Sequence, residues 1–93
     1  MTTIWKYRLA ITDKQTIKVQ QRAIPLYVGF DGNNNLCLWC QVDDNNMIKD
    51  NYIIYIVGTG NPMHDTECKY IGSVKDTYTY QHTTFIWHVF IGI

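Results

Sequence analysis

The chain has 93 residues, of which 46% are hydrophobic and 14% aromatic, and its eight Lys and Arg residues balance eight Asp and Glu residues. A net charge of zero without a basic cluster argues against a nucleic-acid partner, and the lack of an acidic surplus argues against a nucleic-acid mimic. No stretch approaches the roughly 18 apolar residues of a membrane span, and the first residues lack the apolar core of a signal peptide, so we expect a cytoplasmic protein without membrane contact.

Seven short runs of β-branched and aromatic residues, separated by Asp, Asn and Gly, predict β-strands along the whole chain. No window keeps a helical period, so at most one short helical turn is expected, and its best place is residues 61–67, where Asn61 is a cap for Pro62. Without a linker or repeat, residues 1–93 form a single domain. The predicted strands are residues 3–9, 16–20, 23–30, 36–42, 51–57, 69–74 and 84–91.

The spacing of these strands suggests that each one pairs antiparallel with the next. Between the third and fourth strands, DGNNN at residues 31–35 favours a tight hairpin, because Asp-Gly and Asn tolerate positive φ. Residues 43–50, DDNNMIKD, form a longer polar loop of the same kind.

Several predicted strands are apolar on both faces. In LCLWCQV, residues 36–42, alternate side chains point to opposite sides, yet both sets are apolar, and the same holds for residues 52–57 and 85–91. Two apolar faces predict an all-β fold, namely a small β-sandwich or a partly open barrel of about six or seven strands. A second subunit is the other way to cover such a face, so a homo-oligomer is expected.

The sequence gives little support for a metal-binding, redox or catalytic role of its cysteines and histidines. Cys37 and Cys40 have the CxxC spacing, but three residues apart in a strand they face opposite sides, which argues against a metal site or a redox pair. Three cysteines, an odd number, agree with free thiols in a reducing compartment. Of the histidines His64, His82 and His88, none accompanies a nucleophile in a catalytic context, so we predict no catalytic residue, no metal ligand and no cofactor.

Aromatic side chains are too numerous for the core of so small a domain, and at least one exposed aromatic cluster is expected. Exposed Tyr and Trp are typical anchors for proteins or platforms for stacked bases. The rings in question are Trp5, Tyr7, Tyr27, Trp39, Tyr52, Tyr55, Tyr70, Tyr78, Tyr80 and Trp87.

The segment GTGNPM, residues 58–63, follows an apolar strand and looks most like a binding loop. Its amides are able to form a concave nest for an anion, with Thr59 as an added hydroxyl donor. Established phosphate loops, however, have more glycines and open a helix, so a tight turn that needs positive φ is the favoured interpretation.

Five motifs in order resemble a family of short uncharacterised proteins encoded by phages and prophages. They are TIWKYRLAITDKQTIKV, LCLWCQVD, GTGNP, KYIGSV and the final WHVF. This chain departs from the family pattern at Asn61, where members often have His, after residue 19, where no Pro follows, and in the longer stretch at residues 76–84. The resemblance implies a small phage accessory protein in the bacterial cytoplasm. The family has no established chemistry, so the resemblance implies no particular activity.

Proteins of this size and origin commonly counter host defence, so we expect a non-enzymatic binding protein. It would sequester a nucleotide-type signalling molecule or occupy a host defence protein; the alternatives are a phage structural or assembly accessory protein and a small nucleotide-processing enzyme. The candidate ligand-binding residues are Gly58, Thr59, Gly60, Asn61, Trp5, Arg8, Arg22, Tyr70, Trp87 and His88.

Overall fold

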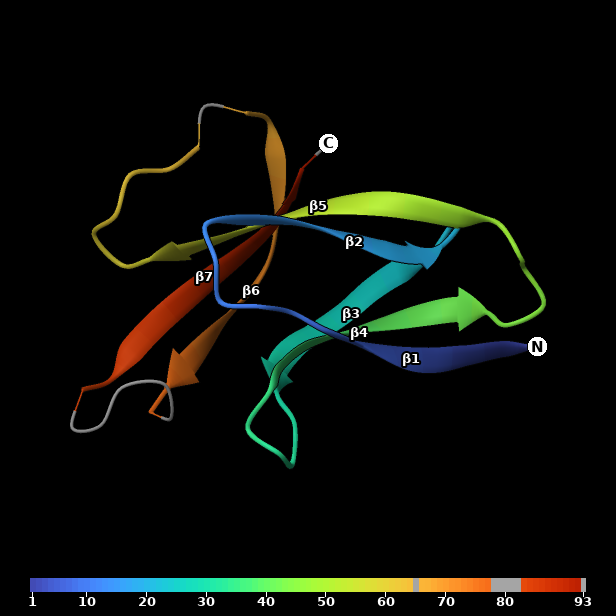
Figure 1. Cartoon of the computed structure of the whole chain (residues 1–93), viewed down its shortest axis with the longest axis horizontal. Helices are drawn as coiled ribbons and strands as arrows, with labels where there is room; N and C mark the ends of the chain where they lie inside the picture. The colour runs from blue at the N-terminus through green and yellow to red at the C-terminus, as the bar shows by residue number, and fades with distance from the viewer. Residues whose placement is uncertain (65, 78–82, 93) are drawn as a thin grey trace.

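The computed structural model describes residues 1–64, 66–77 and 83–92, which fold into seven β-strands in two antiparallel sheets (Figure 1). The predicted all-β sandwich is confirmed, and all seven predicted strands are present with ends that differ by at most two residues. The strands are β1 (Thr2–Arg8), β2 (Lys14–Gln20), β3 (Ile24–Phe30), β4 (Leu36–Asp43), β5 (Lys49–Gly58), β6 (Cys68–Asp76) and β7 (Phe85–Gly92).

The expected pairing of consecutive strands is wrong for most of the chain. One sheet has the order β1-β4-β3 and the other β2-β5-β7-β6, so β3–β4 and β6–β7 are the consecutive strands that pair. The connections at residues 9–13, 21–23 and 44–48 each carry the chain from one sheet to the other. This alternation lets each sheet bury one apolar face against the other.

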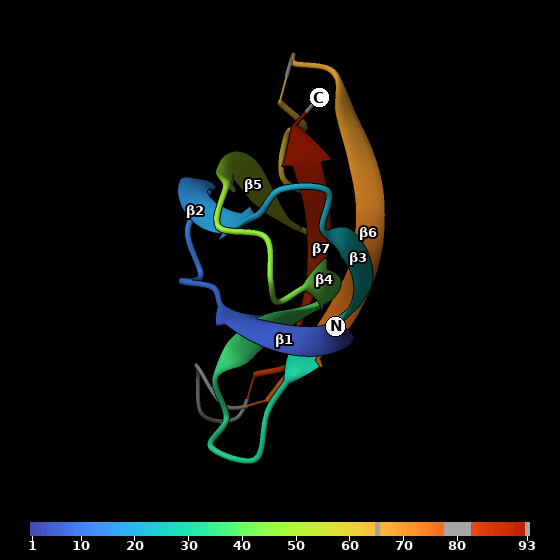
Figure 2. The ribbon, with the colours of Figure 1, turned by 90° about the vertical axis from the view of Figure 1, so that its right-hand side faces the viewer.

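The edge strands β3 and β6 lie side by side where the two sheets meet, as Figure 2 shows. Each has an irregular register at this seam, at Leu26 in β3 and at Ile71 in β6. The backbones approach closely, because a Cβ added at Gly72 would lie 2.9 Å from Cγ1 of Val28. The seam therefore depends on a residue without a side chain in β6.

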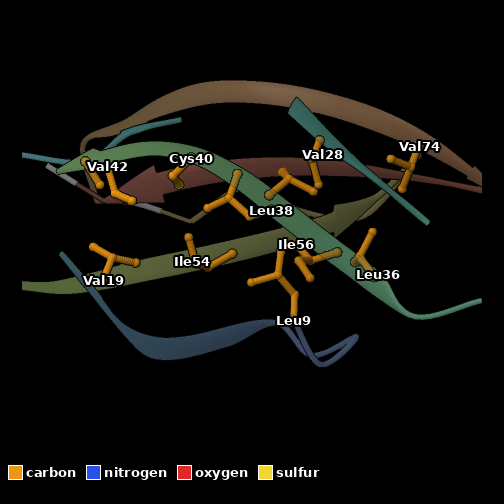
Figure 3. Close-up of a cluster of buried hydrophobic side chains, with 12 residues drawn as sticks. Leu9, Val19, Val28, Leu36, Leu38, Cys40, Val42, Ile54, Ile56 and Val74 are labelled. Carbon is orange, nitrogen blue, oxygen red and sulfur yellow. The ribbon is translucent and has the colours of Figure 1, made fainter. Parts of the chain in front are cut away.

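The core lies between the sheets, with Leu38 near its middle (Figure 3). Alternate residues of β4 point into it, as the two-residue period of a strand requires. Strands of both sheets contribute, and the buried members are Leu9, Val19, Ala23, Val28, Leu36, Leu38, Cys40, Val42, Ile54, Ile56, Val74 and Val89.

Parts of the second apolar faces of β4 and β5 are covered by the chain itself. On β5, Tyr55 and Val57 are buried, and the His64 ring lies 4.4 Å from the Tyr55 ring. On β4, the Cys37 thiol lies 3.7 Å from Oδ2 of Asp31 and is buried. These positions need no second subunit, and the homo-oligomer stays a prediction.

The CxxC cysteines lie on opposite faces of β4, since Cys40 belongs to the core and Cys37 faces outward under Asp31. Burial raises the pKa of the Cys40 thiol to about 11, and burial also raises the pKa of Cys37. Both thiols are therefore protonated at neutral pH, and neither is activated as a nucleophile or metal ligand.

Asp31 organises the hairpin between β3 and β4, as the DGNNN motif predicted. Its Oδ1 accepts the backbone amides of Asn33 and Asn35, and Asn34 takes the positive φ of 61°. The Lys6 ammonium, 2.9 Å from Oδ2, and the Asn35 amide hold the pKa of Asp31 below its usual range. The hairpin is thereby tied to β1.

The helical turn expected at residues 61–67 is not formed, because residues 61–64 and 66–67 have no helical hydrogen bonding and residue 65 lies outside the described residues. Tyr78, Tyr80 and His82 lie outside them too. In the part of the chain that the structure describes, no helix is long and apolar enough to cross a membrane.

Candidate functional site

The GTGNP loop begins with a tight turn at the end of β5. The Asn61 amide donates to the Gly58 carbonyl at 3.0 Å, and Gly60 has a φ of 90°, as the third residue of a type II turn requires. The favoured interpretation of this loop as a turn is confirmed. Figure 1 shows the segment projecting from β5 away from β1.

This turn leaves few amides for an anion. The Thr59 amide donates to the Ile86 carbonyl at 3.4 Å, and the Asn61 amide is used within the turn. Of the amides of Thr59, Gly60 and Asn61, only that of Gly60 is left, whereas an anion nest needs successive free N–H groups. The loop therefore does not form the phosphate cradle that its glycines suggest.

Replacing Gly60 by alanine is expected to cost about 1 kcal/mol of stability, because an L side chain is strained at this φ while the space around it is open. Gly60→Asn should cost less, because asparagine tolerates positive φ. Urea unfolding followed by tryptophan fluorescence measures both, and equal costs for the two variants would contradict this account of the turn.

Four polar side chains form a hydrogen-bonded row on the outer face of the second sheet. The His88 Nε2 lies 2.8 Å from the Thr59 hydroxyl, and its Nδ1 lies 2.7 Å from the Ser73 hydroxyl. The Tyr70 hydroxyl lies 2.7 Å from that of Ser73. Three of the four, Thr59, Tyr70 and His88, are candidate residues from the sequence.

Ser73 is the member of the row that sequence reasoning missed. It faces His88 because β6 pairs with β7 in the register Ser73↔His88. The sequence indicates that the strands containing residues 73 and 88 are consecutive and pair with each other. Only the register of that pair shows that Ser73 and His88 lie side by side. Within the described residues no carboxylate orients His88, and the row lies on an open sheet face, so its geometry suits hydrogen bonding more than proton abstraction.

Trp87 lies near the same loop but has a packing role. Its Nε1 donates to Oδ2 of Asp76 at 2.7 Å, and its ring stacks on Phe85 with centroids 5.4 Å apart. The indole also packs on Gly58, where an added Cβ would lie 3.1 Å from Cζ3. One edge of this indole nevertheless lines the hollows beside the loop.

Shallow hollows surround the GTGNP loop, and Asn61 lines three of them. The largest of these has a volume of about 410 Å³ and is bounded by Asp13, Ile56, Asn61 and the segment 62–64. A second, of about 200 Å³, has Asp13, Asn61 and Trp87 among its walls. No Lys or Arg of the described chain lines any of the three.

The other candidate residues are not brought to this loop. Trp5 lies on β1, where the Lys49 ammonium is 5.7 Å from its ring centroid. Arg8 ends β1, and Arg22 lies in the connection between β2 and β3 with a φ of 64°. The expected combination of arginines with the glycine loop therefore does not exist within one copy of the chain.

A separate exposed cluster covers the outer surface of the β1-β4-β3 sheet. The register Ile4↔Gln41↔Ile24 and Lys6↔Trp39↔Tyr27 places these side chains on one face, opposite the core residues of β4. The Tyr27 and Trp39 rings lie 5.5 Å apart. We call Ile4, Ile24, Tyr27 and Trp39 the aromatic face; it provides the exposed aromatic cluster expected from composition.

Comparison with known proteins gives one finding. A family model described as a domain of unknown function, DUF7352, matches residues 1–93. No curated protein and no solved structure matches the chain.

Proposed function

The chain belongs to the DUF7352 family, whose description assigns no activity, and we propose that it is a small non-enzymatic binding protein of phage origin that counters host defence by occupying a host defence protein in the bacterial cytoplasm. The resemblance of its motifs to phage and prophage proteins supports the origin. The surface of the domain supports the binding of a partner protein over the capture of a nucleotide.

The aromatic face is the observation that carries this proposal. Tyr27 is 62% exposed, Ile4 57% and Ile24 51%, and they lie on one face of the three-stranded sheet. Exposed clusters of large apolar side chains are rare on monomeric domains and mark interaction surfaces, with Tyr and Trp as the usual anchors. An exposed sheet face of this kind suits another protein more than a small molecule, which prefers a concave pocket.

The charges around the aromatic face favour one class of partner. Arg8 and Lys6 lie on the same face of β1, whereas the acidic residues there, Asp31 and Asp43, are ion-paired with Lys6 and the N-terminal ammonium. The Arg8 guanidinium makes no hydrogen bond or ion pair with the residues that the structure describes. We therefore expect the partner to present an apolar patch rimmed by carboxylates.

Nucleotide sequestration has less support within one copy of the chain. The Thr59 amide donates to the Ile86 carbonyl and the Asn61 amide closes the turn. The neighbouring hollows have a carboxylate and no described cation, and Arg8 and Arg22 lie elsewhere. A phosphate at this loop would therefore face a carboxylate without a compensating cation among the described residues.

The test pairs a binding measurement with a defence assay. A tagged chain is used to isolate its partner from the lysate of a defence-active bacterium, and the purified partner is then titrated with variants. Tyr27→Ser and Ile4→Ser should each weaken binding by about 30-fold, as interface anchors do, and should abolish protection of phage plaques.

Ile48→Ser is the matched control, because Ile48 is as exposed as Ile4, at 57%, but lies in the connection between the sheets. It should bind and protect like the wild type. Native mass spectrometry of the isolated species separates the alternatives: an intact nucleotide released on denaturation would favour sequestration, and a dimer through the aromatic face would identify a second copy as the occupant.

A further inference from the structure

Asp13 presents a carboxylate to the hollows beside the GTGNP loop. Its backbone carbonyl accepts the Ile56 amide at 3.2 Å, which holds the residue against β5. The side chain itself makes no hydrogen bond or ion pair with the described residues. The neighbouring Lys14 ammonium lies over the Tyr55 ring, 6.0 Å from its centroid, and gives Asp13 no ion pair.

The surroundings of this carboxylate form a shallow recess beside the loop, and Asp13 and Asn61 are exposed at its edge. Asp13 borders both the hollow of about 410 Å³ and the one of about 200 Å³, and Asn61 stands at the edge of both. Ile56, which is buried, provides an apolar floor, and Trp87 provides an aromatic wall to the smaller hollow. The described lining has a carboxylate and no Lys or Arg. It therefore favours a cationic group, or a group that donates N–H hydrogen bonds, over an anion.

We propose that this recess, which we call the Asp13 recess, binds a planar group with two parallel N–H donors, either a guanidinium or the equivalent edge of a guanine base. A carboxylate accepts such a pair in a bidentate geometry that a lysine ammonium cannot reproduce. The planar body would lie on the apolar floor and beside the Trp87 ring, and the Asn61 carboxamide would supply a further hydrogen bond. The recess is separate from the aromatic face, so this inference does not rest on the proposed function.

Titration of ¹⁵N-labelled protein, followed by amide chemical shifts, tests the proposal and its two sources. The probes are N-acetyl-arginine amide and guanosine, with N-acetyl-lysine amide and adenosine as comparators that lack the paired donors. We expect saturable shifts at residues 13, 56–61, 63 and 64 with at least one of the first two probes, at up to about 10 mM probe, which detects millimolar binding. The probe that saturates identifies a peptide arginine or a guanine as the source.

Asp13→Asn should weaken that binding by about tenfold or more, because one charged acceptor of a bidentate pair is lost. The matched control is Asp50→Asn, an exposed carboxylate on β5 outside the recess, which should bind like the wild type. The spectra report directly whether each variant is folded, and the wild-type shift map locates the site without any variant.

Three results would overturn the proposal. One is the absence of saturable shifts with both N-acetyl-arginine amide and guanosine. Another is equal binding by Asp13→Asn and wild type. The third is a response to the lysine probe as strong as to the arginine probe, since this would show simple charge attraction without recognition of paired donors.

Discussion

Leu38→Ala is expected to lower the free energy of unfolding by about 3 kcal/mol. Leu38 is fully buried on β4, between its partners Tyr7 on β1 and Val28 on β3, and it points into the core between the sheets. Truncation removes buried methyl groups and leaves a cavity, and Leu→Ala changes of this kind cost about 2–5 kcal/mol. A domain of this size has a total stability of only about 5–15 kcal/mol, so this variant loses a large part of it.

Urea unfolding followed by tryptophan fluorescence measures this loss, and Leu26→Ala is its control. Leu26 is the same residue type on the adjacent strand but is 49% exposed, so its truncation should cost less than about 1 kcal/mol. Similar costs at the two positions would mean that the core does not lie between the two sheets as described.

Gly72→Ala is expected to cost about 1–3 kcal/mol, because the new methyl group would meet Val28 at the seam between β3 and β6. The 2.9 Å separation is shorter than a carbon–carbon contact allows, and Val28 is buried with a stiff β-branched side chain. The backbones of two edge strands would therefore have to move apart. Gly32→Ala is the control, because an added methyl group there meets nothing within 4 Å, and it should change stability by less than about 0.5 kcal/mol.

A double-mutant cycle makes this second prediction specific. Val28→Ala removes the methyl group that Gly72→Ala would strike, so the double variant should lose less stability than the two single variants added together. Additive losses would show that the cost at Gly72 comes from the flexibility of glycine alone and not from the close approach of the seam.

Local sequence patterns were sufficient to predict the strands and turns of this fold. The run of apolar and aromatic residues at 36–42 predicts β4, and the DGNNN motif predicts the hairpin in which Asp31 accepts two turn amides and Asn34 takes a positive φ. The turn at Gly60 was likewise predictable from its glycines. These features depend on interactions between residues close in sequence, which the sequence displays directly.

The composition of the candidate sites was not predictable in the same way. Arg8 and Arg22 are candidate ligand-binding residues in the sequence together with the glycine loop, yet they lie elsewhere in the fold. Ser73 was missed because its contact with His88 depends on the register of β6 and β7. Asp13 reaches the loop because the first connection runs beside β5, which no local pattern indicates.

The sequence by itself determined that this chain forms strands with two apolar faces, separated by turns at its Asp, Asn and Gly residues, because alternation and turn chemistry are local properties. The tertiary structure alone decided the order β1-β4-β3 and β2-β5-β7-β6, and with it which apolar face is core and which is the exposed aromatic face. The physical reason is that strand pairing joins residues far apart in the chain, and a face that is apolar in sequence is buried or exposed according to which strand lies opposite.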